Sequence, residues 1–151
     1  MCGIVGYIGE KNCVPILING LKRLEYRGYD SVGIATIDNN QVLVSKEQGK
    51  IIEVIDKIQL DNLQGKIAIG HTRWSTDGPP SKENSHPHTD CKKEITVIHN
   101  GIIENFQSLK KELLANGHIF QSESFPPPGC PRRHLLFQVR RLPARPLDSQ
   151  K

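Results

Sequence analysis

The chain opens with MCGIVGYI, residues 1–8. The apolar run at residues 4–8 stops at Gly9, and a short apolar run bounded by glycine predicts a buried β-strand. Methionine aminopeptidase removes Met when the next residue is small, so we expect the mature chain to begin at Cys2. A terminal cysteine carries both a thiol nucleophile and, in its α-amine, a base with a reference pKa of about 8. Taken alone, the Met-Cys-Gly pattern favours a small buried residue at the start of the strand over a nucleophile.

Apolar spacing predicts the elements that follow. A helix is expected from Pro15 to Gly28, and a hairpin over residues 32–44 with its turn at 38–40. Further patterns predict a short helix at 50–58 with Ile51, Ile52, Ile55 and Ile58 facing inward, strands at 66–71 and 94–99, and a helix at 106–114 that closes at 116–117. Strands dominate and helices do not alternate strictly with them, which favours an α+β layered fold over a doubly wound parallel sheet.

Length, composition and cysteine spacing exclude several classes of protein. A chain of 151 residues with 36% hydrophobic and 24% charged residues is typical of a globular protein rather than a disordered or fibrous one. No apolar run approaches the roughly 18 residues of a membrane span, and no signal-peptide pattern is present, so we expect a cytoplasmic protein with reduced thiols. His86, His88 and Cys91 could in principle ligate zinc, but a fourth ligand and paired spacing are missing, and we predict no metal.

The composition changes abruptly near residue 124. Residues 1–123 contain 14 Lys and Arg against 15 Asp and Glu, whereas residues 124–151 contain six against one, so the net charge of +4 arises in the last 28 residues. Isoleucine occurs 17 times before this point and never after it, and six of the ten prolines follow it. The change indicates a foreign or frame-shifted tail, although a natural low-complexity extension has a similar composition. We expect this Pro/Arg-rich tail to be disordered.

Four stretches, in order, carry a resemblance to a known family. They are MCGIVGYI at 1–8, LEYRGYDS at 24–31, HTRWST at 71–76 and HNGIIEN at 99–105. Together they resemble class II (N-terminal nucleophile) glutamine amidotransferases, and within them the hexosamine branch that aminates fructose 6-phosphate. The phosphoribosyl branch typically has Tyr where Trp74 stands. The resemblance implies a four-layer α/β/β/α sandwich, incomplete here, with a partial glutaminase domain at 2–123 and an unrelated tail at 124–151.

The resemblance implies catalytic roles for three residues. Cys2 would attack the side-chain amide of glutamine and form a thioester. The Asn100 side-chain NH₂ and the Gly101 backbone N–H would stabilise the oxyanion of the tetrahedral intermediate, and one such donor is worth about 3–4 kcal/mol. An Asn-Gly pair after a strand is otherwise an ordinary turn. No cofactor is implied.

The resemblance places Arg73, Trp74, Thr76 and Asp77 in the glutamine pocket. The planar guanidinium of Arg73 suits the α-carboxylate of glutamine. Asp77 departs from the family, which usually has His there, and its carboxylate would compete for Arg73 and weaken glutamine binding. Phe125 stands where the family has the Asp that binds the α-ammonium.

The expected activity is hydrolysis of glutamine to glutamate, with the released ammonia passing to fructose 6-phosphate in domains that the chain lacks. Because half of the sandwich would also be missing, we expect the chain alone to be unstable and to have little glutaminase activity. Full-length family members are expected to be homo-oligomers, and no pattern indicates nucleic-acid binding. The alternatives are a glutaminase that serves another acceptor and a non-catalytic remnant or interaction module whose tail binds partners.

Overall fold

The computed structural model describes residues 2–58, 60–74, 79–101, 103–120, 122 and 136–140. Its strands are β1 (Gly3–Ile8), β2 (Ser31–Asp38), β3 (Gln41–Gln48), β4 (Ile67–Arg73), β5 (His88–Thr89), β6 (Ile95–His99) and β7 (Leu136–Arg140). Its helices are α1 (Cys13–Leu24), α2 (Ile51–Val54) and α3 (Phe106–Ala115), with 3₁₀ turns at Glu25–Arg27 and Leu60–Asn62. Within this part of the chain, no helix is long and apolar enough to cross a membrane.

The first sheet has the strand order β1-β4-β2-β3, and every pairing in it is antiparallel. β2 and β3 form the expected hairpin, and both turn residues, Asn39 and Asn40, have positive φ, which matches the twist of the two strands. β4 lies between β1 and β2. Its register pairs Gly3 with Thr72 and the first residue of β2 with Arg73. The beginnings of β1 and β2 therefore lie beside the end of β4.

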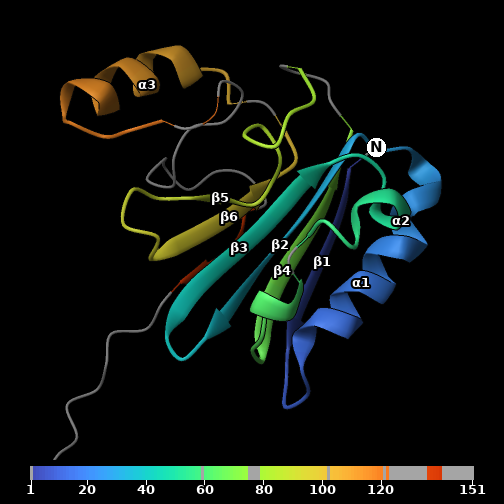
Figure 1. Ribbon diagram of the computed structural model, residues 1–151. Coiled ribbons are helices and arrows are strands. Elements are labelled where there is room, and N and C mark those ends of the chain that lie inside the picture. The colour runs from blue at the N-terminus through green and yellow to red at the C-terminus, as the bar shows by residue number, and fades with distance from the viewer. Residues whose placement is uncertain are drawn as a thin grey trace, which may run out of the picture.

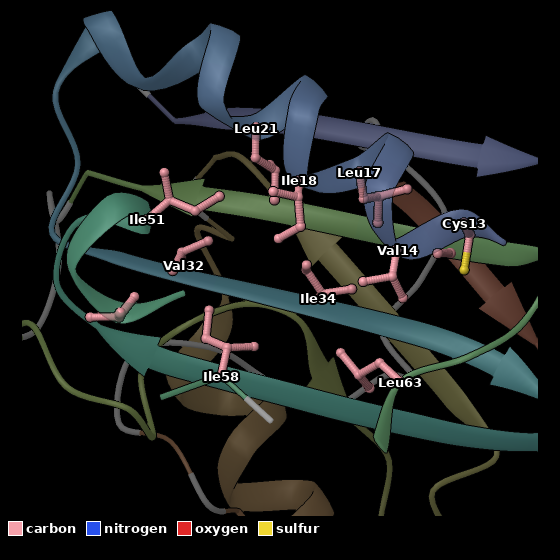
Figure 2. Packing of buried hydrophobic residues seen from close by; sticks show 12 residues of the cluster. Cys13, Val14, Leu17, Ile18, Leu21, Val32, Ile34, Ile51, Ile58 and Leu63 are labelled. Carbon is pink, nitrogen blue, oxygen red and sulfur yellow. The ribbon is translucent and has the colours of Figure 1, made fainter. Parts of the chain in front are cut away.

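Helix α1 covers one face of this sheet (Figure 2). The helix begins after Asn12, whose side-chain oxygen accepts a hydrogen bond of 3.1 Å from the Val14 N–H. Pro15 is therefore the third residue of the helix rather than the first. The buried cluster joins α1 to β2, β4 and the 51–63 segment, and consists of Cys13, Val14, Leu17, Ile18, Leu21, Val32, Ile34, Ile51, Val54, Ile58, Leu63 and Ala68.

The opposite face of the first sheet packs against the second sheet, whose order is β5-β6-β7. Ala35 and Ile69 of the first sheet form a small buried cluster with Ile98 of β6. Because side chains alternate along a strand, His71 and Arg73 of β4 share the face of Ile69 and point into the layer between the sheets. With α1 and α2 outside the first sheet and α3 beyond the second, the layers follow the expected helix–sheet–sheet–helix order (Figure 1).

Two further details differ from the sequence-based expectations. The helix at 50–58 is shorter, because α2 ends at Val54, and Ile52 is 68% exposed instead of facing inward. Val54 is buried in its place, since residues 51 and 54 lie on one side of a helical turn. Within the tail expected to be disordered, residues 136–140 form β7 and pair antiparallel with β6, an open edge able to accept another strand. The domain boundary at residue 123 stays a prediction.

Leu17 tests the assignment of the core. It is fully buried, so Leu17→Ala is expected to lower the free energy of unfolding by about 2–5 kcal/mol, through lost apolar contact and the cavity left behind. Urea unfolding followed by circular dichroism measures the change. Leu114→Ala, at a half-exposed leucine of α3, is the matched control and should cost less than about 1 kcal/mol. Equal losses for the two variants would contradict the assignment of the α1 face as the core.

Candidate functional site

The sequence motifs meet at one end of the first sheet. Cys2 immediately precedes β1, and the register of β1 places it next to the end of β4. The 24–31 motif leads into the start of β2, which pairs with the same end of β4. Asn100 follows β6 and contacts β4 from the second sheet. Each of the other three motifs therefore lies next to residues 71–74.

The Cys2 thiol is half-buried and lies against the backbone of Trp74. The Trp74 N–H donates a hydrogen bond to Cys2 Sγ over 3.3 Å. The Cys2 thiol in turn donates a hydrogen bond to the Trp74 carbonyl oxygen over 3.5 Å. The two contacts fix the sulfur next to the loop that follows β4. A cysteine held in this way is not a small core residue, because its sulfur lies at the edge of the sheet beside polar backbone atoms.

Gly28, from the Tyr-Arg-Gly motif, lies against the ring of Trp74. It has φ of +79°, and a Cβ atom built at this position would lie 2.4 Å from the ring atom Cζ3. Both the backbone conformation and the close approach therefore require glycine. Trp74 is 49% exposed, so the chain's only tryptophan is partly open to solvent rather than part of the core.

Gly28→Ala is expected to displace the Trp74 ring and to lower the free energy of unfolding by about 1–3 kcal/mol, because alanine is strained at this φ and its methyl group overlaps the ring. The fluorescence of the single tryptophan should shift toward longer wavelength as the ring moves into solvent. Gly6→Ala is the matched control, since a Cβ there meets no atom within 4 Å. An unchanged emission spectrum in Gly28→Ala would contradict the contact.

Arg73 lies at the end of β4 and is only 5% exposed. Its carbonyl oxygen accepts a 2.7 Å hydrogen bond from the Asp30 N–H, and the Ser31 hydroxyl donates to the Asp30 carboxylate over 3.1 Å. These bonds attach the start of β2 to the end of β4. Binding of a substrate carboxylate by Arg73 stays a prediction.

Asn100 and Gly101 lie at the exposed end of β6. The Asn100 side-chain oxygen lies 2.8 Å from Nε2 of His71, so the amide is tied to β4. Gly101 has φ of +153°, and a Cβ there would lie 3.0 Å from Nε2 of His99, so a side chain at this position would be both strained and crowded. The Asn-Gly pair is thus more than an exposed turn, because contacts with both sheets hold it.

Three histidines form a buried row behind the site. The ring centroids of His71 and His86 are 4.6 Å apart, as are those of His86 and His88, and both pairs meet edge to face. Burial lowers the pKa of His71 to about 4, despite its hydrogen bond to Asn100, and the charge of Arg73 acts in the same direction. Burial likewise lowers the pKa of His86 and His88 well below 6.5. All three rings are therefore neutral at pH 7.

The structure also shows what the motif-based reading missed. Sequence reasoning assigned no role to His71, although the alternation of side chains already places residue 71 on the same face of the strand as Arg73. Thr76, Asp77 and Phe125 lie outside the described residues, so the expectations for them stay predictions. Within the described residues, no group of three or more His, Cys, Asp or Glu side chains could hold a metal ion.

Sequence comparison relates this site to a family of enzymes. The chain is 56% identical over 124 residues to a glutamine–fructose-6-phosphate aminotransferase (isomerizing) of Pyrococcus horikoshii, an alignment that covers 82% of this chain and 21% of the relative. The enzymes of that name from Methanococcus maripaludis and Sulfolobus acidocaldarius are 53% and 50% identical, again over 82% of this chain and over 20% and 22% of theirs. The matched residues are similar to the N-terminal portion of glutamine–fructose-6-phosphate aminotransferases. The chain spans about one fifth of the length of these relatives and corresponds to their N-terminal portion.

Solved structures support the same assignment. A glutamine phosphoribosylpyrophosphate amidotransferase from B. subtilis is 32% identical with a TM-score of 0.66, covering 82% of this chain and 27% of that one. A structure described as the allosteric regulatory enzyme of purine biosynthesis is 33% identical with a TM-score of 0.68, covering 81% and 27%. The chain therefore shares the fold of a solved glutamine amidotransferase, and the α+β fold expected from the sequence is confirmed. No family model matches the chain.

Proposed function

We propose that this chain carries the glutaminase site of a glutamine–fructose-6-phosphate aminotransferase. After removal of Met1, the Cys2 sulfur attacks the side-chain carbonyl carbon of glutamine while the α-amine of Cys2 takes the thiol proton. The tetrahedral intermediate collapses with cleavage of the C–N bond, and that proton leaves with ammonia. Water then hydrolyses the thioester, which releases glutamate and restores the thiol.

Asn100 and Gly101 are proposed to stabilise the negative oxygen of the tetrahedral intermediate. Both lie at the end of β6, and the side chain of Asn100 is attached to β4 two positions before the end of that strand. Fixed donors stabilise developing charge more effectively than mobile water, because they need no reorganisation during the reaction. The rigid anchoring of this pair supports the role.

The glutamine pocket is proposed to include Arg73, Trp74, Thr76 and Asp77. Trp74 is well placed, because its backbone contacts the nucleophilic sulfur and its ring is partly exposed. Arg73 is buried, so a substrate carboxylate would have to reach a guanidinium that lies between the sheets. A buried guanidinium binds a carboxylate strongly once the two are in contact.

The sugar half of the reaction is proposed to take place outside this chain. The relatives are named for fructose 6-phosphate, and this chain spans only about one fifth of their length. We place the reaction in the cytoplasm, where thiols stay reduced, and the three cysteines that the structure describes are all free. We further propose that the complete protein is a homo-oligomer.

One observation carries the proposal. The sulfur of Cys2 and the amide of Asn100 lie far apart in the sequence and belong to different sheets, yet both contact the short stretch of residues 71–74. A nucleophile and an anchored amide donor next to the same strand end are the two parts that acyl transfer from an amide requires.

The test is selective labelling of Cys2 by 6-diazo-5-oxo-L-norleucine, a thiol-reactive analogue of glutamine, with peptide mass spectrometry to locate the label. Cys91 is an internal control, because it is also free and is more exposed than Cys2. We expect the analogue to label Cys2, to spare Cys91, and to be blocked by L-glutamine but not by D-glutamine. Equal labelling of both cysteines, or no protection by L-glutamine, would contradict the proposal.

A further inference from the structure

A side-chain hydrogen bond joins the two sheets next to the proposed oxyanion site. It runs between Nε2 of His71 on β4 and Oδ1 of Asn100 at the end of β6, over 2.8 Å. His71 is fully buried, whereas Asn100 is exposed, so the bond connects the protein interior with the solvent-facing end of β6.

The chemistry of the two groups fixes the direction of this bond. The Asn100 oxygen can only accept, so Nε2 of His71 must carry the proton and donate it. Nδ1 of His71 is then the unprotonated nitrogen. It is buried, and it has no hydrogen-bond partner among the residues that the structure describes, which suits a lone pair better than an N–H group.

We infer that His71 is a positioning residue, which holds the Asn100 amide with its oxygen toward β4 and its NH₂ group toward the reacting carbonyl. The inference rests on the proposed function, because it concerns the same oxyanion site. An amide has two orientations of nearly equal shape, related by a half-turn about its last bond. Only one of them presents a donor to the oxyanion, whereas the other presents an oxygen that repels it.

The surroundings of His71 keep its ring neutral and in one tautomer. The ring contacts His86 edge to face, and its burial next to Arg73 disfavours a second proton, with a pKa near 4. A neutral imidazole bound on one side to an acceptor is held in one tautomer. The orientation of Asn100 is therefore set before substrate arrives, and the reaction does not have to select it.

A reversible covalent probe measures this effect without turnover. The nitrile analogue of glutamine, L-2-amino-4-cyanobutanoate, accepts the Cys2 sulfur at its nitrile carbon: an S–C bond forms, one C≡N π bond breaks, and the thiol proton moves to nitrogen. That nitrogen occupies the place of the oxyanion. We expect His71→Leu to weaken nitrile binding about 10²-fold, and His71→Gln, whose amide N–H₂ replaces Nε2–H, to recover most of the loss.

Two controls separate positioning from general damage. Alkylation of Cys2 by iodoacetamide needs no oxyanion site, so its rate should stay within about twofold in both variants. His88→Leu changes a second buried histidine of the same row and should leave nitrile affinity within about threefold. Nitrile binding by His71→Leu equal to that of the wild type would overturn the positioning role. Failure of the wild-type chain to bind the nitrile at Cys2 would instead contradict the proposed function.

The hydrogen bond itself is tested in the unmodified chain. Nitrogen-15 NMR of the histidine rings at pH 7 distinguishes the two neutral tautomers, and we expect His71 to carry its proton on Nε2. This measurement needs neither a substitution nor activity. A ring protonated on Nδ1 would overturn the inference, because Nε2 could then not donate to Asn100.

Discussion

Cys2→Ala is expected to abolish the release of glutamate from glutamine, a loss of at least about 10³-fold, because the thioester cannot form without the sulfur. Removing the nucleophile from a hydrolase that uses covalent catalysis costs up to about 10⁶-fold, and the remaining hydrolysis comes from the oxyanion site and substrate binding. The measurement is conversion of ¹⁴C-labelled glutamine at high protein concentration, since we expect the chain by itself to turn over slowly.

The matched control is Cys91→Ala, which removes a free, exposed thiol far along the chain from the proposed site. Its rate of glutamate release should equal that of the wild type. The Cys2 side chain is half-buried at the edge of the sheet, so Cys2→Ala should unfold at nearly the same urea concentration as the wild type. A fall in glutamate release of less than tenfold in Cys2→Ala would contradict a nucleophilic role for this thiol.

Acid is expected to destabilise this protein strongly between pH 6.5 and pH 4. The row of His71, His86 and His88 is buried, and the charge of Arg73 faces all three rings, with Lys46 also acting on the latter two. Burial lowers the pKa of His71 to about 4, and it lowers the pKa of His86 and His88 in the same direction. In the unfolded chain these groups return to a pKa of about 6.5.

The direction in which the free energy of unfolding changes with pH follows from proton uptake by the unfolded chain. Below pH 6.5 the unfolded chain binds protons that the folded chain excludes, so the free energy of unfolding falls as the pH is lowered, until the folded rings also titrate. For His71 alone the loss by pH 4 is about 3 kcal/mol. His86 and His88 add losses of the same sign, and the sum is large compared with the stability of a small domain, which is about 5–15 kcal/mol.

Urea unfolding at a series of pH values from 7 to 4 measures this dependence. His118→Gln, at an exposed histidine outside the row, controls for the loss of a histidine side chain as such. His88→Gln removes one titrating group from the row and should flatten the dependence, even if it lowers stability at pH 7. A free energy of unfolding that is constant from pH 7 to pH 5 would contradict the burial of these rings.

Much of the fold could be predicted from local patterns. The apolar run at 4–8, the hairpin with Asn39 and Asn40 at its turn, and the buried strand at 94–99 each lie close to where the structure places them. Helix α2 was predicted too long, because four isoleucines between residues 51 and 58 satisfy a helical pattern over a longer range than the one that packs. β7 could not be predicted, because its pairing with β6 depends on a distant edge rather than on its own Pro- and Arg-rich surroundings.

In the candidate site, too, some residues could be predicted from the sequence and others could not. Cys2, Trp74 and Asn100 could be singled out because motifs of unusual residue types surround them. The contact between Gly28 and the Trp74 ring could not be predicted, since nothing local to the Tyr-Arg-Gly motif specifies which side chain covers the glycine. His71 was overlooked for a related reason: a buried histidine in a strand has no distinctive neighbours in sequence, and its partner lies 29 residues further along the chain.

The sequence by itself determined the resemblance to glutamine amidotransferases, the motif around Cys2 and the residue types available for acyl transfer, because these depend on the order of residues along the chain. Only the tertiary structure decided which groups meet: the backbone of Trp74 at the sulfur of Cys2, Gly28 against the Trp74 ring, and His71 on the amide of Asn100. These contacts join separate strands, and the first sheet places β4 between β1 and β2 although β4 follows both in the chain. Packing of apolar faces sets that arrangement, and residues distant in sequence become neighbours only once the two sheets have closed on each other.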